Sequence, residues 1–170
     1  MNHVLGVSFF SVGDNVVYPT HGVGQIIAEE IQVIAGTGIS LYVILFSKDK
    51  MTLRVPKSKA VKTGLRHLSS ESELQRAMRV LKSKAKFPKG MWSKRAQEYD
   101  SKINSGQVDL IAEVLRDLHR NVDDPDRSYS EKVIYDIALE RFAHEYSIAM
   151  SLPKDETKTK ILSVLNYFRD

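Results

Sequence analysis

The first third of the chain carries short runs of β-branched and aromatic residues, separated by glycines and polar turns. Such runs are typical of β-strands, because branched side chains pack well on a pleated surface. The pattern predicts strands near residues 12–18, 25–34, 39–46 and 51–56, with a turn at residues 35–38. Short strands at this close spacing indicate a small antiparallel β-barrel.

The last two predicted strands differ in what their faces carry. Residues 41–46 are apolar on both faces, so this strand is either central in its sheet or meets a partner. In residues 51–56 one face is apolar, and the other carries Thr52 and Arg54. Arg54 is therefore an outward cation on an otherwise apolar edge.

From residue 69 onward the apolar period changes from two to 3.6, which predicts helices. Ser70 and Glu73 have the spacing of a capping box, and Ser128 and Glu131 repeat it. Five helices are expected, beginning near residues 71, 92, 108, 129 and 154. In the last one the side chains expected to pack inward are Ile161, Leu162, Leu165 and Phe168.

Strands followed by helices, without alternation, favour an α+β fold. The expected architecture is an N-terminal antiparallel β-barrel followed by a C-terminal all-α bundle of about five helices. The expected organisation is a tail at residues 1–9, the barrel at residues 10–66 and a basic helical domain at residues 67–170.

The composition restricts the chemistry. The 170 residues include no cysteine, which excludes disulfides and thiolate metal sites and fits a reducing compartment. The N-terminal residues lack the pattern of a signal peptide, and no apolar run is long enough to span a membrane. We therefore expect a soluble, cytoplasmic protein.

Charge is distributed unevenly along the chain. The net charge is +4, but residues 48–102 hold sixteen Lys and Arg against five Asp and Glu, a local excess of eleven positive charges. The remainder then carries an excess of seven negative charges. This polarity is either the footprint of a polyanion such as nucleic acid or an ordinary solvated face.

No motif of catalysis is present. The five histidines are scattered, no metal-binding helix motif or nucleophile elbow occurs, and Gly22-Val23-Gly24 leads into a strand rather than a helix that could hold phosphate. These glycines are expected to serve a turn that needs a positive φ. We expect no enzyme activity, no metal and no cofactor; a hydrolase with an unusual site is a less favoured alternative.

The sequence has a single tryptophan, Trp92, which follows the Pro88-Lys89-Gly90 break at the start of a predicted helix. One interpretation is that the ring anchors the helix against the core. The other is an apolar wedge on a cationic surface, with the lysines neutralising phosphates while the indole enters a groove or stacks on a base. The surrounding cations are Lys84, Lys86, Lys89, Lys94 and Arg95.

The sequence resembles the CarD/CdnL family of bacterial RNA-polymerase-binding transcription regulators, from about residue 10 to the C-terminus. The similar segments are Phe10-Ser11-Val12-Gly13-Asp14-Asn15-Val16-Val17-Tyr18-Pro19, His21-Gly22-Val23-Gly24, Leu53-Arg54-Val55-Pro56, Trp92-Ser93-Lys94-Arg95, Ser105-Gly106 and Glu113-Val114-Leu115-Arg116-Asp117-Leu118. Together these motifs are specific, although each one alone would be weak.

The resemblance implies a Tudor-like barrel, related to SH3-like barrels, that docks on the polymerase β subunit partly through strand pairing. The residues expected at this contact are Thr52, Leu53, Arg54, Val55 and Pro56. It further implies that Trp92 enters the minor groove at the upstream edge of the melted promoter and stabilises the open complex. The residues expected to contact promoter DNA, without sequence specificity, are Trp92, Lys94, Arg95, Lys86, Lys89 and Arg116.

The chain departs from the family pattern at three positions. Gln32, Ala96 and Gln97 are neutral where relatives can be basic, which weakens the expected grip on polymerase and on DNA. The rival hypothesis is a protein-interaction adaptor without DNA contact, in which Trp92 is buried and the lysines are merely solvated.

Overall fold

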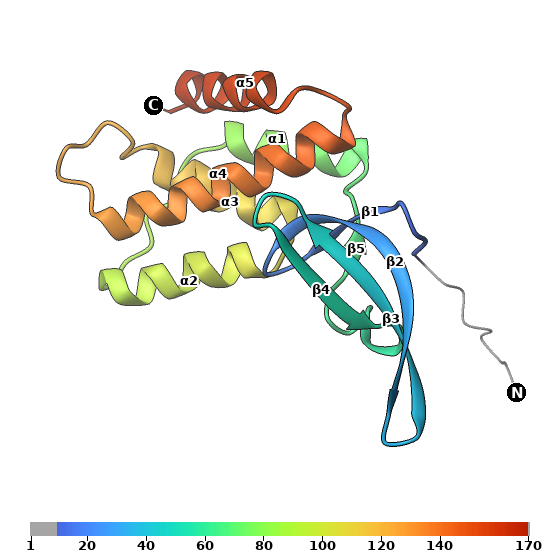
Figure 1. Ribbon diagram of the computed structural model, residues 1–170. Helices are drawn as coiled ribbons and strands as arrows, with labels where there is room; N and C mark the ends of the chain where they lie inside the picture. Colours follow the sequence, from blue (N-terminus) through green and yellow to red (C-terminus); the bar gives the residue numbers. More distant parts are fainter. Residues whose placement is uncertain (1–9, 170) are drawn as a thin grey trace, which may run out of the picture. The chain divides into compact units, whose positions relative to one another are not determined.

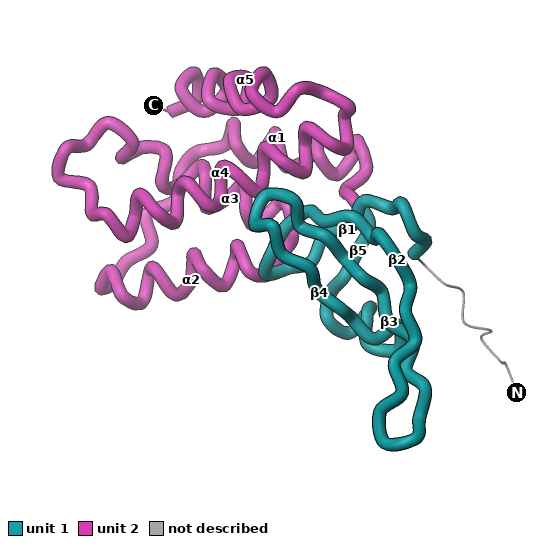
Figure 2. The backbone as a smooth tube through the Cα atoms, in the orientation of Figure 1, with its two compact units in different colours: residues 1–67 teal, residues 68–170 magenta. Residues whose placement is uncertain are grey.

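The computed structural model describes residues 10–169, and the expected tail at residues 1–9 lies outside the described part. The chain divides between His67 and Leu68 into two compact units, coloured separately in Figure 2. Each unit has its own apolar cluster, and each is described by itself below. In the described residues, five strands precede five α-helices, which confirms the predicted α+β class.

The first unit is an antiparallel sheet with the strand order β4-β3-β2-β1-β5. Its strands are β1 (Asn15–Tyr18), β2 (Gly22–Ile34), β3 (Thr37–Phe46), β4 (Met51–Pro56) and β5 (Arg66–His67). The apolar β3 lies between β2 and β4, so the central position is the one the structure supports. The short β5 and a 3-10 helix at Lys57–Lys59 were not predicted, because neither has enough residues to form a pattern.

The β2–β3 connection is tighter than predicted. Only Ala35 and Gly36 lie between the strands, and both have a positive φ, of 49° and 78°. Two central residues with positive φ form the type I′ turn, whose twist matches that of the flanking strands. The hairpin projects beyond the rest of the sheet (Figure 1), and residues 31–38 are exposed throughout.

The sheet curls around a core of aromatic and branched side chains, which includes Ile26, Tyr42, Ile44 and Phe46. Gly24 is required by this core: a Cβ there would lie 2.7 Å from Ile44 and 2.8 Å from Phe46. The predicted turn role holds for Gly22, whose φ is 79°, but not for Gly24. Val12, expected in the first strand, lies outside it and is 55% exposed.

The second unit consists of α1 (Glu71–Lys82), α2 (Trp92–Asn104), α3 (Val108–His119), α4 (Tyr129–Ala149) and α5 (Lys154–Tyr167). The capping box predicted at Ser70 is present with both of its hydrogen bonds, and the Ser128 hydroxyl accepts from the Glu131 amide. A side chain that satisfies a free N–H of the first turn fixes where a helix begins. This explains why these two helix starts were predictable.

α3 is the central helix of this unit and contacts α1, α2 and α4. Its apolar face, at Val108, Ile111, Leu115 and Leu118, is buried as its periodicity predicts. In α5, Ile161 and Leu165 are buried, but Phe168 is 40% exposed. The inward prediction for Phe168 is wrong, because the helix ends at Tyr167 and the residue lies beyond its last regular turn.

Candidate functional site

The edge of the sheet in the first unit is formed by β4. This strand pairs with β3, and no other described strand pairs along its second side. An unpaired edge offers free N–H and C=O groups to a strand from another protein. Strand β4 contains all five residues predicted to contact polymerase, Thr52, Leu53, Arg54, Val55 and Pro56.

Those five residues do not present their side chains alike. Thr52 and Arg54 are exposed, and Leu53 and Pro56 are partly buried. Val55 is 3% exposed and belongs to the core of the sheet. Only the backbone of Val55 is therefore open to a partner, so its part in the expected contact would be strand pairing.

Arg54 is held in place by Glu30 on β2. Its Nε lies 2.9 Å from Glu30 Oε2, and its Nη2 lies 3.4 Å from Oε1. The hydrogen bonds lower the pKa of Glu30 and raise the pKa of Arg54. Lys57, just past β4, is paired in a similar way, with its Nζ 2.6 Å from Glu29 Oε2. The cations at this edge are thus matched by carboxylates.

The sheet also has an apolar surface that the sequence reasoning did not single out. Ile31, Val33 and Ile34, on the projecting part of β2, are 75%, 74% and 56% exposed. Gln32, one of the departures from the family pattern, is exposed among them. The sequence offers a signal in the three branched residues that accompany Gln32 next to the turn, but a branched run of this kind equally fits an ordinary strand.

In the second unit, Trp92 is the first residue of α2 and is partly buried. Its ring centroid lies 6.2 Å from that of the buried Tyr99, and its Nε1 lies 3.4 Å from the Ser130 hydroxyl. The Arg95 guanidinium lies 5.5 Å from the indole centroid, within the range of a cation–π contact. The ring is thus anchored on one side and open on another, a state between the two interpretations of the sequence.

The loop between α1 and α2 and the first turn of α2 carry the exposed cations Lys84, Lys86, Lys89 and Lys94. Among the described residues, no carboxylate lies within ion-pair distance of any of them. Unpaired cations next to an open aromatic edge are the arrangement expected of a phosphate-contacting surface. Two positions of α2 depart from the family pattern by being neutral. Gln97 is exposed, whereas Ala96 packs against the helical core.

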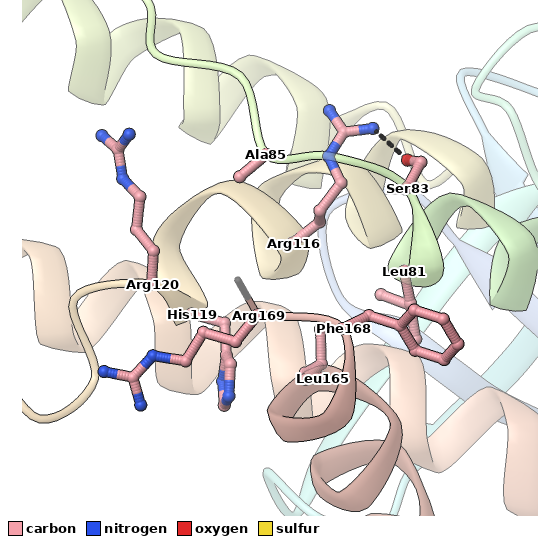
Figure 3. Close-up of a pocket in the computed structure, with 9 residues that line it drawn as sticks. All are labelled: Leu81, Ser83, Ala85, Arg116, His119, Arg120, Leu165, Phe168 and Arg169. Carbon is pink, nitrogen blue, oxygen red and sulfur yellow. Dashed lines mark hydrogen bonds between the residues drawn. The ribbon is translucent and has the colours of Figure 1, made fainter.

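Arg116, predicted to contact DNA, is occupied inside the fold. Its side chain is 7% exposed; its Nε lies 2.8 Å from Asp117 Oδ1, and its Nη1 lies 2.9 Å from the Ser83 hydroxyl. Figure 3 shows the guanidinium directed at Ser83. Because the side chain is buried and its charge is paired with Asp117, Arg116 is not open to a phosphate, although its Nη2 has no hydrogen-bond partner among the described residues.

Arg116 also borders a small hollow formed by α1, α3 and the end of α5 (Figure 3). The hollow encloses about 10 Å³, which is room for one water molecule at most. Its other basic lining residues are His119, Arg120 and Arg169, and the Arg169 guanidinium points away from those of Arg116 and Arg120. Since the cations do not converge, the hollow is not an anion site.

Two exposed apolar residues precede Trp92. Phe87, in the loop before α2, is 67% exposed, and Met91, the N-cap residue of α2, is 78% exposed. Tyr129, which precedes the Ser130 that binds the indole, is 81% exposed. Sequence reasoning missed all three, although Phe87 and Met91 flank the same Pro88-Lys89-Gly90 break.

The described residues include no helix that is long and apolar enough to cross a membrane. They also include no group of His, Asp and Glu side chains that could hold a metal ion.

An open-edged β-domain followed by a helical domain with a basic loop and a half-open indole defines a two-domain binding protein. Residues 10–69 match the CarD-like/TRCF RID domain family, and residues 76–162 match the CarD, C-terminal domain family. The chain is 30% identical over 150 residues to the Bacillus subtilis (strain 168) protein named "Putative transcription factor YdeB", a match that covers 88% of this chain and 98% of that protein.

The chain therefore belongs to the CarD-like family of transcription regulators. Regulators of this family are not enzymes, in agreement with the prediction from the motifs. Membership also implies binding to RNA polymerase through the N-terminal domain.

Proposed function

We propose that this protein binds the β subunit of RNA polymerase through the β4 edge and stabilises the open promoter complex by wedging Trp92 into the minor groove at the upstream end of the bubble. The two units then have separate tasks. The first tethers the protein to polymerase, and the second acts on the shape of the DNA that polymerase has already selected. Base-specific contacts are not needed for this action.

The unpaired edge of β4 supports the tether. A partner strand added there would satisfy its free backbone groups, and the exposed Thr52 and Arg54 would give the contact its specificity. The apolar hairpin residues Ile31, Val33 and Ile34 offer further surface on the same sheet. Large apolar side chains exposed together mark binding surfaces more often than scattered ones do.

The single observation that carries the DNA half is the environment of Trp92: an indole that is partly open, anchored through Ser130, and bordered by exposed lysines without carboxylate partners. Anchoring reduces the rotamer freedom that would be lost on binding. The lysines add affinity for any phosphate backbone, while the indole discriminates between shapes of DNA.

The effect on transcription follows from differential binding. A ligand shifts the equilibrium between closed and open DNA only by its difference in affinity for the two states. Stacking of an aromatic ring on a base contributes about 1–3 kcal/mol, and each 1.4 kcal/mol changes an equilibrium tenfold. We therefore expect the wedge to change the lifetime of the open complex by about one to two decades.

The test is the lifetime of the open complex on one promoter, measured with wild-type protein, Trp92→Ala and Trp92→Phe. Trp92→Ala should shorten the lifetime to near that without protein, and Trp92→Phe should retain part of the effect. Because the ring also contacts the core, thermal unfolding and polymerase association of each variant are measured in parallel. If a folded, polymerase-bound Trp92→Ala variant still stabilises the complex, the wedge is wrong.

The contact of Trp92 with Tyr99, at 6.2 Å between centroids, favours a second candidate, an adaptor in which the indole has only a packing role. Under this alternative Trp92→Ala lowers the melting temperature, and wild-type protein leaves the lifetime of the open complex unchanged. The two functions thus differ in the wild-type measurement itself.

A further inference from the structure

Phe87 is an exposed aromatic residue in the loop between α1 and α2. Its ring is 67% exposed, although burial of a side chain of this size would be favourable by about 1.5–3 kcal/mol. Its neighbours in the chain include the exposed cations Lys86 and Lys89. Phe87 therefore does not serve as a core residue.

One face of the Phe87 ring is covered by Arg120, whose guanidinium carbon lies 3.4 Å from the ring centroid. This is the distance of parallel stacking between two flat groups. Arg120 Nε and Nη1 are buried and have no hydrogen-bond partner among the described residues. Arg120 thus covers one face of the Phe87 ring, and the rest of the ring is open to solvent.

The loop that carries Phe87 is fixed to α3. The Lys86 amide donates to Asp117 Oδ1 at 2.8 Å, and the same oxygen accepts from Arg116 Nε. Arg116 also donates to the Ser83 hydroxyl, at the other end of the residues 83–86. Asp117 is 1% exposed, so the anchor is internal. Phe87 is therefore displayed next to a fixed backbone.

We propose that Phe87, backed by Arg120, is a second stacking platform that receives an unpaired base of the DNA strand whose duplex edge meets Trp92. This inference rests on the proposed function and assigns it a further contact residue. An aromatic ring stacks on any base, because every base has a π-face, and neighbouring lysines neutralise the phosphates. Arg116 and Asp117 are then positioning residues for the loop and do not touch DNA.

The spacing of the two rings suits one DNA fork. Phe87 and Trp92 are five residues apart, so their Cα atoms are separated by at most about 18 Å. Successive phosphates of a strand rise by about 3.4 Å, so this reach corresponds to about five nucleotides at most. Both rings can therefore contact one junction between paired and unpaired DNA.

The experiment measures dissociation constants of the full chain for two DNAs by fluorescence anisotropy: a duplex, and the same duplex with an unpaired thymine arm. Phe87→Ala and Phe87→Leu should each weaken binding to the forked DNA about five-fold or more, since both lose stacking. Phe87→Tyr, which keeps the ring, should bind as wild type does. Tyr167→Ala, which removes an 82% exposed aromatic of α5, is the matched control and should change nothing.

The outcomes separate this inference from the proposed function. If Trp92→Ala weakens binding to the fork but Phe87→Ala does not, the second platform is wrong and the wedge stands. If Phe87→Ala weakens fork and duplex equally, or Phe87→Leu binds as Phe87→Tyr does, the ring does not stack on an unpaired base. Equal melting temperatures of the Phe87 variants and wild type exclude unfolding as the cause of a loss.

Discussion

The two candidate surfaces differ in whether their cations are paired with carboxylates. At the β4 edge, Arg54 and Lys57 are each paired with a glutamate of β2. In the loop before α2 and in the first turn of α2, the exposed Lys84, Lys86, Lys89 and Lys94 have no carboxylate partner in the described part of the chain. The first surface is suited to backbone pairing and apolar contact, and the second to a polyanion. Under the proposed function, the two surfaces would therefore not compete for the same partner.

A similar contrast exists among the arginines of the helical unit. Arg95 and Arg120 lie against aromatic rings, whereas Arg116 is enclosed with Asp117. A count of basic residues in a segment therefore overstates the number that can meet phosphate. Four measurements test the difference between the two surfaces.

The largest effect is expected from Asp117→Ala. This change leaves the buried Arg116 guanidinium without its counter-ion and should lower the free energy of unfolding by about 3–5 kcal/mol. Urea denaturation measures it, with Asp100→Ala, at an exposed position of α2, as the control. Equal stability of the two variants would mean that the Arg116–Asp117 pair does not hold the loop.

Next in size is Arg54→Glu. The new carboxylate would repel Glu30 and remove the exposed cation of β4, and central arginines are often dominant contacts in interfaces. We expect association with polymerase to weaken by about 30-fold or more. Lys62→Glu reverses an exposed cation elsewhere in the same unit and should leave association unchanged. Identical behaviour of both variants would exclude β4 as the docking edge.

A smaller effect is expected from removing single lysines of the loop. Each phosphate contact that is lost should reduce the slope of log K against log salt concentration by about 0.9 on duplex DNA. Lys86→Ala and Lys89→Ala are measured by anisotropy over a series of salt concentrations, with Lys62→Ala of the other unit as the control. An unchanged slope in both loop variants would mean that these cations are merely solvated.

The smallest effect concerns pH. His119 is 3% exposed, with its Nδ1 2.7 Å from the Tyr135 hydroxyl and its Nε2 2.7 Å from Asn166 Oδ1. Burial lowers the pKa of His119 below its ordinary value of 6.5. Because the unfolded chain then binds the proton more readily, stability is complete above pH 6.5 and falls as the pH drops further, by at most about 1.4 kcal/mol per pH unit.

Unfolding free energies of wild type and His119→Gln between pH 5 and 8 measure this effect. The difference between the two proteins should shrink as the pH falls, since only wild type has to take up this proton. A constant difference across the range would mean that His119 does not contribute to the pH dependence of stability.

Much of the fold was predictable from the sequence because its signals are local. Helix α2 begins at Trp92 after a Pro-Gly break, and α1 begins after a capping box whose two partners are three residues apart. Strand β4 was predicted with its observed bounds, because period-two alternation extends over its whole length. Such features depend on neighbours in the chain and not on tertiary packing.

The predictions that were wrong or missing concern contacts between residues far apart in the sequence. Arg116 is buried because Ser83, 33 positions earlier, lies beside it, and Gly24 is needed because Ile44 and Phe46 lie over it. No pattern of residue spacing in the sequence predicts either contact. The candidate surfaces were predicted as segments, but which of their side chains face solvent could be assigned only from the structure.

The brevity of β4 has a consequence for the protein when it is without a partner. A long, flat, unpaired edge would recruit a second copy of the chain and lead toward aggregation. Here the exposed edge spans only Met51–Pro56, its centre carries a charged pair, and its last residue is a proline, which has no N–H to donate. The strand therefore limits self-association by its own sequence while it keeps a template long enough for one incoming segment.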